Sequence, residues 1–336
     1  MANVNVLVTG GSGFVAGWTI RKLLEKGYNV KTTVRSKGKG EIVKSMLQNS
    51  NIDVSSFSYT IADLESEKGW DNAMEDIDYV LHIASPLGGE NHNDPKLIDT
   101  AKSGAINVIN AAIKAKIRKV VMTSSGAANY PEKNDANQNV DETLWTDLDN
   151  KFITNYMRSK IHAERIAWDL IEKQDATQLA TVLPGAIMGP FMDKRNGSTD
   201  QIFQMLLKGT PSPKVVYPVV DVRDLADLHI LAMESPKANG QRFIAESGEK
   251  TMRQMAKILR NNMGEHGKKV STIIIPNFVV SLSAKFNPAM KVLLTMINVK
   301  NHHTNKKART LLNWKPRPAK DTVIDTANYL IESNLL

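Results

Sequence analysis

An alternating apolar run over residues 4–8 leads directly into a glycine-rich segment, residues 9–17, and then into a helical pattern. Gly10 and Gly13 let the backbone turn tightly and approach a ligand, and the small Ala16 lets a helix pack close to the strand. The N–H groups and positive dipole end of such a helix suit a diphosphate. A glycine cluster alone also fits an ordinary turn, but the order strand, turn, helix predicts a dinucleotide-binding unit.

Strand and helix patterns alternate through the first half of the chain, as a parallel sheet with crossover helices requires. Further strands are expected at residues 30–34, 57–61, 79–83, 120–123 and 180–183. Helices are expected at residues 14–26, 98–112 and 152–173, where apolar side chains recur at helical spacing. The alternation predicts a doubly wound α/β fold of the Rossmann type.

The rhythm changes after Pro184, where several prolines mark loops. A strand at residues 215–222 and a helix at 224–233 follow, and the remainder reads as mostly helical. We therefore expect a dinucleotide-binding domain and a smaller, mostly helical substrate-binding domain. The first would span residues 1–188 and regain residues 215–247, and the second would comprise residues 189–214 and 248–336.

Composition excludes several classes of protein. The 336 residues contain no cysteine, which rules out disulfides, thiolate zinc sites and a cysteine nucleophile. No export signal or membrane-spanning run is visible, so we expect a soluble, cytoplasmic protein with no membrane partner. The net charge of +8 comes from a basic stretch, residues 251–320. Its lysines stand singly between apolar residues, as on a solvated surface, so we expect no nucleic-acid partner.

Tyr156 and Lys160 are four residues apart in a predicted helix and therefore lie on one face. Because a tyrosine with a pKa of about 10 gives up its proton reluctantly, a neighbouring ammonium that lowers this pKa would make it a better proton donor to a carbonyl. This spacing is common by chance, and Ser125 alone reads as a turn hydroxyl. Ser125, however, follows a predicted strand, and the carboxyl ends of parallel strands form the ligand edge of such a sheet.

Arg35 and Lys39 follow the second strand, where NAD-specific enzymes place an acid for the ribose 2′-hydroxyl. Two cations there favour a 2′-phosphate, which predicts NADPH as the cofactor; the alternative is that both are ordinary surface charges. Asp63, after the third strand, fits either an acceptor for the adenine amine or a turn residue.

The glycine turn, Ser125, Tyr156 and Lys160, in this order, resemble the extended short-chain dehydrogenase/reductase superfamily. Further segments look like its dihydroflavonol reductase and cinnamoyl-CoA reductase group, which includes microbial NADPH-dependent aldehyde (methylglyoxal) and ketone reductases. These segments are residues 82–86, 156–168, 184–185, 220–226 and 314–317. The resemblance extends over essentially the whole chain.

The resemblance implies a catalytic set in which Ser125 holds the substrate carbonyl oxygen, Tyr156 is the acid and Lys160 holds the nicotinamide ribose. It also implies a set of cofactor contacts. These are Gly10, Ser12, Gly13, Phe14 and Val15 for the pyrophosphate, Arg35 and Lys39 for the 2′-phosphate, Asp63 and Leu64 for adenine, Ile83, Ala84 and Ser85 on the ribose side, and Pro184, Gly185 and Ile187 for the nicotinamide amide.

The expected function is NADPH-dependent reduction of an aldehyde or ketone to the alcohol. Two alternatives stay open: a nucleotide-sugar epimerase or dehydratase on the same scaffold, and a non-catalytic NADP sensor. A monomer and a homodimer are both compatible with the resemblance. Ala101 stands where many superfamily members carry a relay Asn, and an ungapped match places Tyr130, not Asn129, at the flavonoid-reading position. A flavonoid substrate is therefore not expected.

Two further segments carry expectations of their own. Residues 189–198 are predicted to cover the substrate, with Phe191 and Met192 as wall residues, or to be an ordinary connection. His302 and His303 lack a third ligand at metal-like spacing. We expect them to form a solvated turn and expect no metal site.

Overall fold

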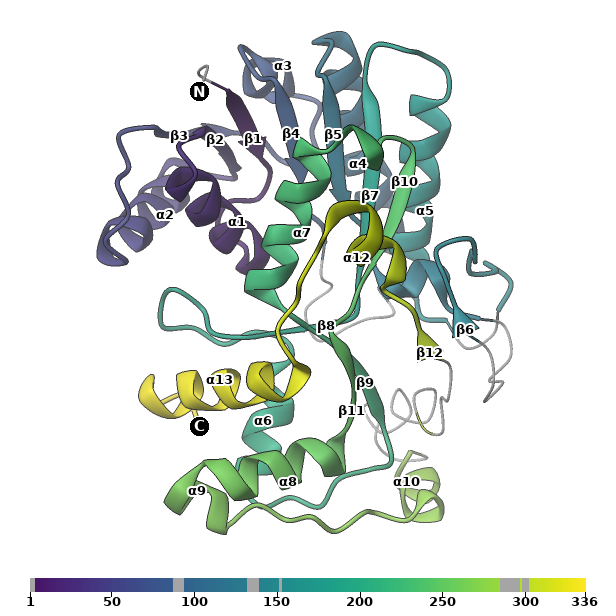
Figure 1. Cartoon of the computed structure of the whole chain (residues 1–336). Helices are drawn as coiled ribbons and strands as arrows, with labels where there is room; N and C mark the ends of the chain where they lie inside the picture. The colour runs from purple at the N-terminus through teal and green to yellow at the C-terminus, as the bar shows by residue number, and fades with distance from the viewer. Residues whose placement is uncertain (1–3, 87–93, 132–138, 151–152, 285–296, 298–301) are drawn as a thin grey trace.

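Seven parallel strands form the main sheet in the order β10-β7-β5-β4-β1-β2-β3 (Figure 1). The computed structural model describes residues 4–86, 94–131, 139–150, 153–284, 297 and 302–336. The seven strands are β1 (Asn5–Val8), β2 (Asn29–Val34), β3 (Phe57–Ile61), β4 (Tyr79–His82), β5 (Lys119–Thr123), β7 (Gln178–Pro184) and β10 (Gln241–Ala245). The strand order reverses between β1 and β4, the place where doubly wound sheets bind ligands. The predicted Rossmann-type fold is confirmed.

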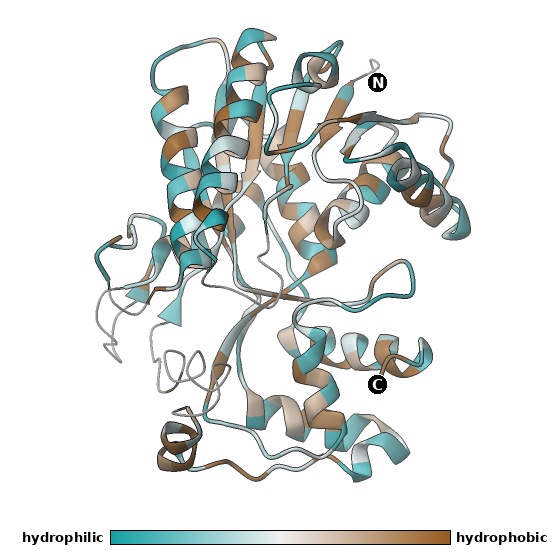
Figure 2. Cartoon of the chain, turned by 180° about the vertical axis from the view of Figure 1, so that it is seen from behind, coloured by the Kyte–Doolittle hydropathy of each residue, from teal (hydrophilic) through white to brown (hydrophobic). Residues whose placement is uncertain are grey.

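Helices cover both faces of the main sheet, because side chains alternate between the faces along each strand. On one face lie α1 (Phe14–Glu25), α2 (Lys37–Asn49) and α7 (Val222–Glu234); on the other lie α3 (Trp70–Met74), α4 (Lys96–Lys114) and α5 (Asn155–Ile171). In β1, Val6 and Val8 are buried in the first layer, and Leu7 between them is buried in the second. Figure 2 shows hydrophobic strands between helices of mixed hydropathy.

The six strands predicted for the first half of the chain are all present, with boundaries shifted by two residues or fewer. The helix expected from residue 152 begins at Asn155, where the Thr154 side chain accepts a bond from the Met157 N–H; Phe152 lies outside the described residues. The structure adds α2, which the sequence analysis did not predict, after its N-cap residue Ser36.

A second lobe is built around a three-stranded sheet, in which β9 (Val216–Asp221) lies between β8 (Ala186–Met188) and β11 (Gly248–Thr251). This sheet packs against α6 (Asp200–Leu207), α8 (Met252–Asn262) and α13 (Ala319–Glu332). Phe203 and Leu259 are buried in this second core. The strand expected at residues 215–222 is β9, but the sequence analysis assigned it to the first domain, expected mostly helices here and did not predict the sheet. The division of cofactor and substrate binding between two domains stays a prediction.

Short elements complete the described parts of the chain. They are η1 (Gly126–Asn129), β6 (Asn139–Val140), η2 (Pro236–Ala238), α9 (Gly264–Lys268), α10 (Asn277–Ser283), β12 (His302–His303) and α12 (Lys306–Leu312). Among the described residues, none of the helices is both long and apolar enough to cross a membrane.

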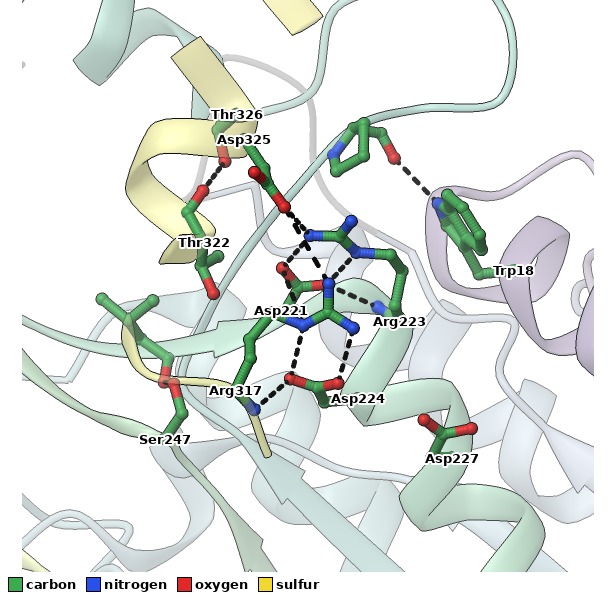
Figure 3. Close-up of polar contacts among 12 residues, drawn as sticks. Trp18, Asp221, Arg223, Asp224, Asp227, Ser247, Arg317, Thr322, Asp325 and Thr326 are labelled. Atoms are coloured by element: carbon green, nitrogen blue, oxygen red, sulfur yellow. Dashed lines mark hydrogen bonds and ion pairs between the residues drawn. The ribbon is translucent and has the colours of Figure 1, made fainter. Parts of the chain in front are cut away.

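A cluster of ion pairs joins α7 to α13 (Figure 3). The Arg223 guanidinium lies 2.7 Å from the fully buried carboxylate of Asp221 and 2.5 Å from that of Asp325 in α13. Arg317 pairs with Asp224 at 2.9 Å. Because each buried carboxylate has a guanidinium partner, the first turn of α7 and the C-terminal helix are held as one unit.

Candidate active site and cofactor site

The glycine turn after β1 has a geometry that only glycine fits well. Gly10 has a φ of +73°, and a Cβ on it would lie 2.9 Å from the Cβ of Ala84. The Gly13 N–H donates to the Gly10 carbonyl at 2.8 Å and closes the turn. Glycine at position 10 therefore lets this turn pack closely against the loop after β4, and its approach to a ligand stays a prediction.

Helix α1 starts immediately after this turn with an open N-terminus. Its N-cap residue, Gly13, makes no side-chain capping bond, and its first turn contains no acidic residue. The N–H groups of Phe14 and Val15 therefore point out of a positive helix end with no side chain competing for them. Together with the half-buried Ser12, these residues fit a pyrophosphate.

The loop after β4 is fixed beside the glycine turn by one hydroxyl. Thr9 Oγ1 accepts the N–H groups of Ile83 (3.0 Å) and Ala84 (2.9 Å) and lies 2.9 Å from His82 Nδ1. Burial, and secondarily the charge of Lys160, lower the pKa of His82 to about 4, so the ring is neutral and Nδ1 can accept the Thr9 proton. The predicted ribose-side residues thus lie next to the predicted pyrophosphate residues.

Arg35 and Lys39 are both exposed, just after β2 and in the first turn of α2. Both are accessible to a 2′-phosphate at the same edge as the glycine turn. Asp63 follows β3, and its carboxylate accepts the Glu65 N–H at 3.1 Å, which is a turn contact. The neighbouring Leu64 carbonyl accepts a bond from Asn107 at 3.1 Å.

The three predicted catalytic residues come from β5 and α5. Ser125 follows β5 and caps η1, its Oγ accepting the Ala127 N–H at 3.1 Å. Tyr156 is in the first turn of α5, and the Lys160 ammonium lies 5.5 Å from the centre of its ring. Lys160 Nζ also donates to Ser85 Oγ at 2.5 Å, which links α5 to the loop after β4.

The direction of one pKa differs from the sequence analysis. We expected Lys160 to lower the pKa of Tyr156, but burial raises it in this structure. The phenolate would be taken out of water, and the ammonium lies over the ring and bonds to Ser85. Burial also lowers the pKa of Lys160 to about 8.

Pro184, Gly185 and Ile187 lie where the main sheet passes into the second lobe, at the carboxyl end of β7 and in β8. A Cβ on Gly185 would lie 2.3 Å from the Pro218 carbonyl oxygen, so a side chain there would push β9 away. The predicted nicotinamide contacts are therefore held between the two sheets.

A buried ionic network behind Ser125 was not assigned a role from sequence. Glu164, with no exposed surface, accepts bonds from Ser124 Oγ (2.6 Å), Thr181 Oγ1 (2.7 Å) and Arg242 Nε (2.9 Å). Arg242 also donates to three backbone carbonyls, those of Glu142, Leu144 and Ala128. The network ties α5, β5 and β10 together. Its only sequence signal was Glu164, a charged residue on the apolar side of the helix.

Phe191 and Met192, the expected wall residues, pack on α1, and their contact with a substrate stays a prediction. Phe191 stacks on Phe14 with ring centres 3.8 Å apart. Its main-chain neighbour Pro190 accepts the Trp18 indole N–H at 2.8 Å, and Figure 3 shows this bond as the dashed line from Trp18. A Cβ on Gly17 would lie 3.1 Å from the Met192 methyl carbon. The segment therefore packs on the helix of the glycine turn, because aromatic and apolar side chains on both sides bury each other there.

The expected solvated turn is wrong, because His302 and His303 form strand β12. The His302 side chain is 62% exposed, as expected of a solvated residue, but that of His303 is 11% exposed. His303 Nδ1 forms an ion pair with Glu246 at 3.0 Å, and His302 pairs with Glu249 at 2.9 Å. Burial lowers the pKa of His303, but the two glutamates outweigh burial and raise it. Ligand atoms of Glu246, Glu249 and His303 lie within 4.8 Å of one another. This cluster lies at β12, which pairs with β6.

A sheet with a ligand edge at β1 and β4, an open helix end and a tyrosine–lysine pair define a dinucleotide-dependent enzyme of the Rossmann type. The model of the NAD dependent epimerase/dehydratase family matches residues 6–245. Cinnamoyl-CoA reductase 1 of Arabidopsis thaliana is 35% identical over 254 residues, which are 73% of this chain and 71% of that protein. Dihydroflavonol 4-reductase of Gerbera hybrida is 33% identical over 273 residues, 78% of this chain and 73% of that protein. The chain belongs to the NAD dependent epimerase/dehydratase family, in the extended short-chain dehydrogenase/reductase superfamily.

The structure of yeast methylglyoxal/isovaleraldehyde reductase Gre2 with NADPH aligns with a TM-score of 0.83 and 25% identity over 99% of this chain and all (100%) of that chain. A Gre2 complex with NADPH from Candida albicans aligns with a TM-score of 0.83 and 27% identity, covering 98% of this chain and 99% of that one. These relatives support an NADP-dependent reductase over the epimerase and the sensor. A UDP-glucose 4-epimerase from Thermotoga maritima, 19% identical, shares the fold.

Proposed function

We propose that Ser125, Tyr156 and Lys160 catalyse the NADPH-dependent reduction of a small aldehyde or ketone to its alcohol. The observation that carries this proposal is the joint placement of Tyr156 and Lys160 at the carboxyl edge of the sheet, where Lys160 reaches Ser85 beside the glycine turn. The similarity to yeast Gre2, a methylglyoxal/isovaleraldehyde reductase, supports small carbonyl compounds as the substrate class.

The residues of the glycine turn fit the cofactor, because the open N-terminus of α1 offers N–H donors and no acid. Phe14 and Val15 would hold the pyrophosphate, Arg35 and Lys39 the 2′-phosphate, and Asp63 and Leu64 the adenine. Ile83, Ala84 and Ser85 would line the ribose, and Pro184, Gly185 and Ile187 the nicotinamide. When bound, NADPH supplies the hydride.

The protein's own groups handle the oxygen of the substrate. The Ser125 hydroxyl donates a hydrogen bond to the carbonyl oxygen and fixes its position. Tyr156, whose pKa is raised by burial, keeps its proton at neutral pH and delivers it to the oxygen as the alcohol forms. The Lys160 ammonium is close enough to the Tyr156 ring to stabilise the phenolate that remains.

The experiment follows NADPH absorbance with purified protein and a panel of aldehydes, α-dicarbonyls, ketones and UDP-sugars. A reductase consumes NADPH with the carbonyl compounds and loses this activity in the Ser125→Ala and Tyr156→Phe variants. Conversion of a UDP-sugar without net oxidation of NADPH would establish the epimerase instead, and NADPH binding without any turnover would establish the sensor.

Three finer points remain predictions. A cytoplasmic location is checked by cell fractionation, and the choice between monomer and homodimer by size-exclusion chromatography with light scattering. The absence of a nucleic-acid partner is checked by filter binding, in which salt-sensitive retention of DNA or RNA would contradict it.

A further inference from the structure

A segment of the second lobe crosses the helix of the glycine turn. We call residues 190–195 the strap. It begins where Pro190 accepts the Trp18 indole N–H and continues with Phe191 stacked on Phe14. These contacts place the strap along the first turns of α1. The strap therefore lies beside the predicted pyrophosphate site.

The strap ends with a cation at the glycine turn. Arg195 Nη1 donates to the carbonyl of Ser12 at 2.6 Å. Ser12 directly precedes Gly13, the N-cap of α1, so the guanidinium stands one residue from the open helix end. In its first turn α1 has no acidic residue that could attract this cation.

The position of Arg195 is held from three sides. Its Nε pairs with Asp193 at 2.7 Å, its guanidinium lies 5.1 Å from the centre of the Phe191 ring, and its backbone N–H donates to the Tyr329 hydroxyl at 3.1 Å. The same hydroxyl lies 2.6 Å from the Arg195 carbonyl oxygen, to which it can donate. Tyr329 belongs to α13, so the C-terminal helix fixes the strap.

Arg195 keeps donors for a ligand. The hydrogen bonds to the Ser12 carbonyl and to the Met46 sulfur use one N–H on each of its two terminal nitrogens, while Nε lies in an ion pair with Asp193. A guanidinium has five N–H groups, so one remains on each terminal nitrogen. Its side chain is 31% exposed, and a phosphate can reach it.

We propose that Arg195 binds the diphosphate of the dinucleotide, opposite the N–H groups of α1. The inference rests on the proposed seat of the cofactor at the glycine turn. The contacts that support the inference do not involve Arg35 or Lys39, which follow β2 and lie in α2, where the 2′-phosphate is predicted to bind. The diphosphate would then be held by both lobes, with Asp193 orienting the guanidinium and the strap carrying it.

The test compares NADPH with NADH, which share the diphosphate but differ in the 2′-phosphate. Dissociation constants for both are measured by calorimetry for the wild type and for Arg195→Met, Arg195→Lys, Lys194→Met and Arg35→Ser. Charge-assisted hydrogen bonds contribute enough that Arg195→Met is expected to weaken both cofactors by the same factor, about ten- to a hundredfold. Arg195→Lys keeps the charge but not the planar guanidinium. The factor by which it weakens both cofactors is expected to be about a third to a tenth of the factor for Arg195→Met.

Two variants are controls for charge and site. Lys194→Met removes an exposed cation from the adjacent position and is expected to leave both constants within about twofold. Arg35→Ser is expected to weaken NADPH alone. Unchanged constants for Arg195→Met, a loss confined to NADPH, or an equal loss for Lys194→Met would each overturn the proposal. If Arg195→Met does not fold, Arg195→Lys is used in its place, and the proposal then requires that this variant weaken NADPH and NADH by the same factor. A wild type that binds neither cofactor would instead refute the proposed function.

Discussion

The Lys160 ammonium donates to the Ser85 hydroxyl at 2.5 Å, and this bond joins the helix of Tyr156 to the loop after β4. Both residues lie at the point where the strand order reverses, between the glycine turn and Ser125. Because the ammonium is buried, its protonation depends on pH within the range in which enzymes are assayed.

This burial predicts a pH limit on catalysis. The pKa of Lys160 is lowered to about 8, so the ammonium is complete below about pH 7 and is lost as the pH rises through 8. We expect kcat/KM for carbonyl reduction to be flat near neutrality and to fall with rising pH above about 8. A stopped-flow pH profile checks this, and a profile that stays flat to pH 9.5 would contradict it.

The lowered pKa of Lys160 also affects stability, and a rise in pH, which lowers activity, is expected to raise stability. Between pH 8 and the ordinary pKa of 10.5, the unfolded chain binds more protons at Lys160 than the folded chain. The contribution of Lys160 to the free energy of unfolding is therefore expected to increase as the pH rises through that window. Urea unfolding of the wild type and of Lys160→Met at pH 7 and pH 9.5 measures the difference, which should shrink in the variant.

Replacing Tyr156 by Phe removes the proposed proton donor and leaves the ring. We expect kcat to fall by about 10²–10⁴-fold, the usual contribution of general acid catalysis. NADPH affinity should change by less than about threefold. Turnover near the wild-type rate, with NADPH bound normally, would show that another group delivers the proton.

Replacing only one partner of the buried Glu164–Arg242 ion pair is expected to lower the free energy of unfolding strongly. Glu164→Gln leaves a buried guanidinium without its carboxylate, so we expect a loss of about 3–5 kcal/mol in the free energy of unfolding. The double variant with Arg242→Met should be less destabilised than the sum of the single variants, by about 1–3 kcal/mol.

An exposed pair provides the control for this experiment. Arg118 pairs with Asp78 at 3.0 Å, and its side chain is 64% exposed. Arg118→Met is expected to cost less than about 1 kcal/mol. The free energies of unfolding are measured by urea unfolding. If the losses in the two single variants at Glu164 and Arg242 simply add up in the double variant, the buried pair is not coupled.

Two glycines with similar φ values allow the cost of a left-handed backbone to be measured separately from the cost of a steric contact. Gly10 and Gly27 have φ values of +73° and +82°, but a Cβ on Gly27 meets nothing within 4 Å. Gly27→Ala is expected to cost about 1 kcal/mol, from the left-handed backbone alone. Gly10→Ala should cost more, because its Cβ would press on Ala84, and it should weaken NADPH binding. Equal unfolding free energies for the two variants would contradict this reading.

The sequence predicted the local parts of the fold well because their signals are local. Alternating apolar residues in β1 and glycine at positions 10 and 27 act within a few residues of themselves. The edge strand β10 lacked such a signal, because its first two residues, Gln241 and Arg242, are polar. Arg242 is nevertheless buried, since its partner Glu164 lies far away in the chain.

Contacts between distant segments explain the rest of the differences. The stacking of Phe191 on Phe14 joins the two lobes, and the pairing of His303 with Glu246 joins β12 to the residue after β10. No spacing in the sequence records either contact. The pKa of Tyr156 was predicted from its neighbour four residues away. Its actual direction depends on burial, which comes from the whole fold.

The role of α13 in holding the strap has a consequence for how the protein is made. The strands of the main sheet are all synthesised by residue 245, but Tyr329, in α13, comes much later in the sequence. A nascent chain on the ribosome can therefore pair its sheet while the strap still lacks its anchor. Because Tyr329 anchors the backbone of Arg195, we expect the strap to become fixed beside Ser12 only after α13 has been synthesised, and therefore later than the main sheet.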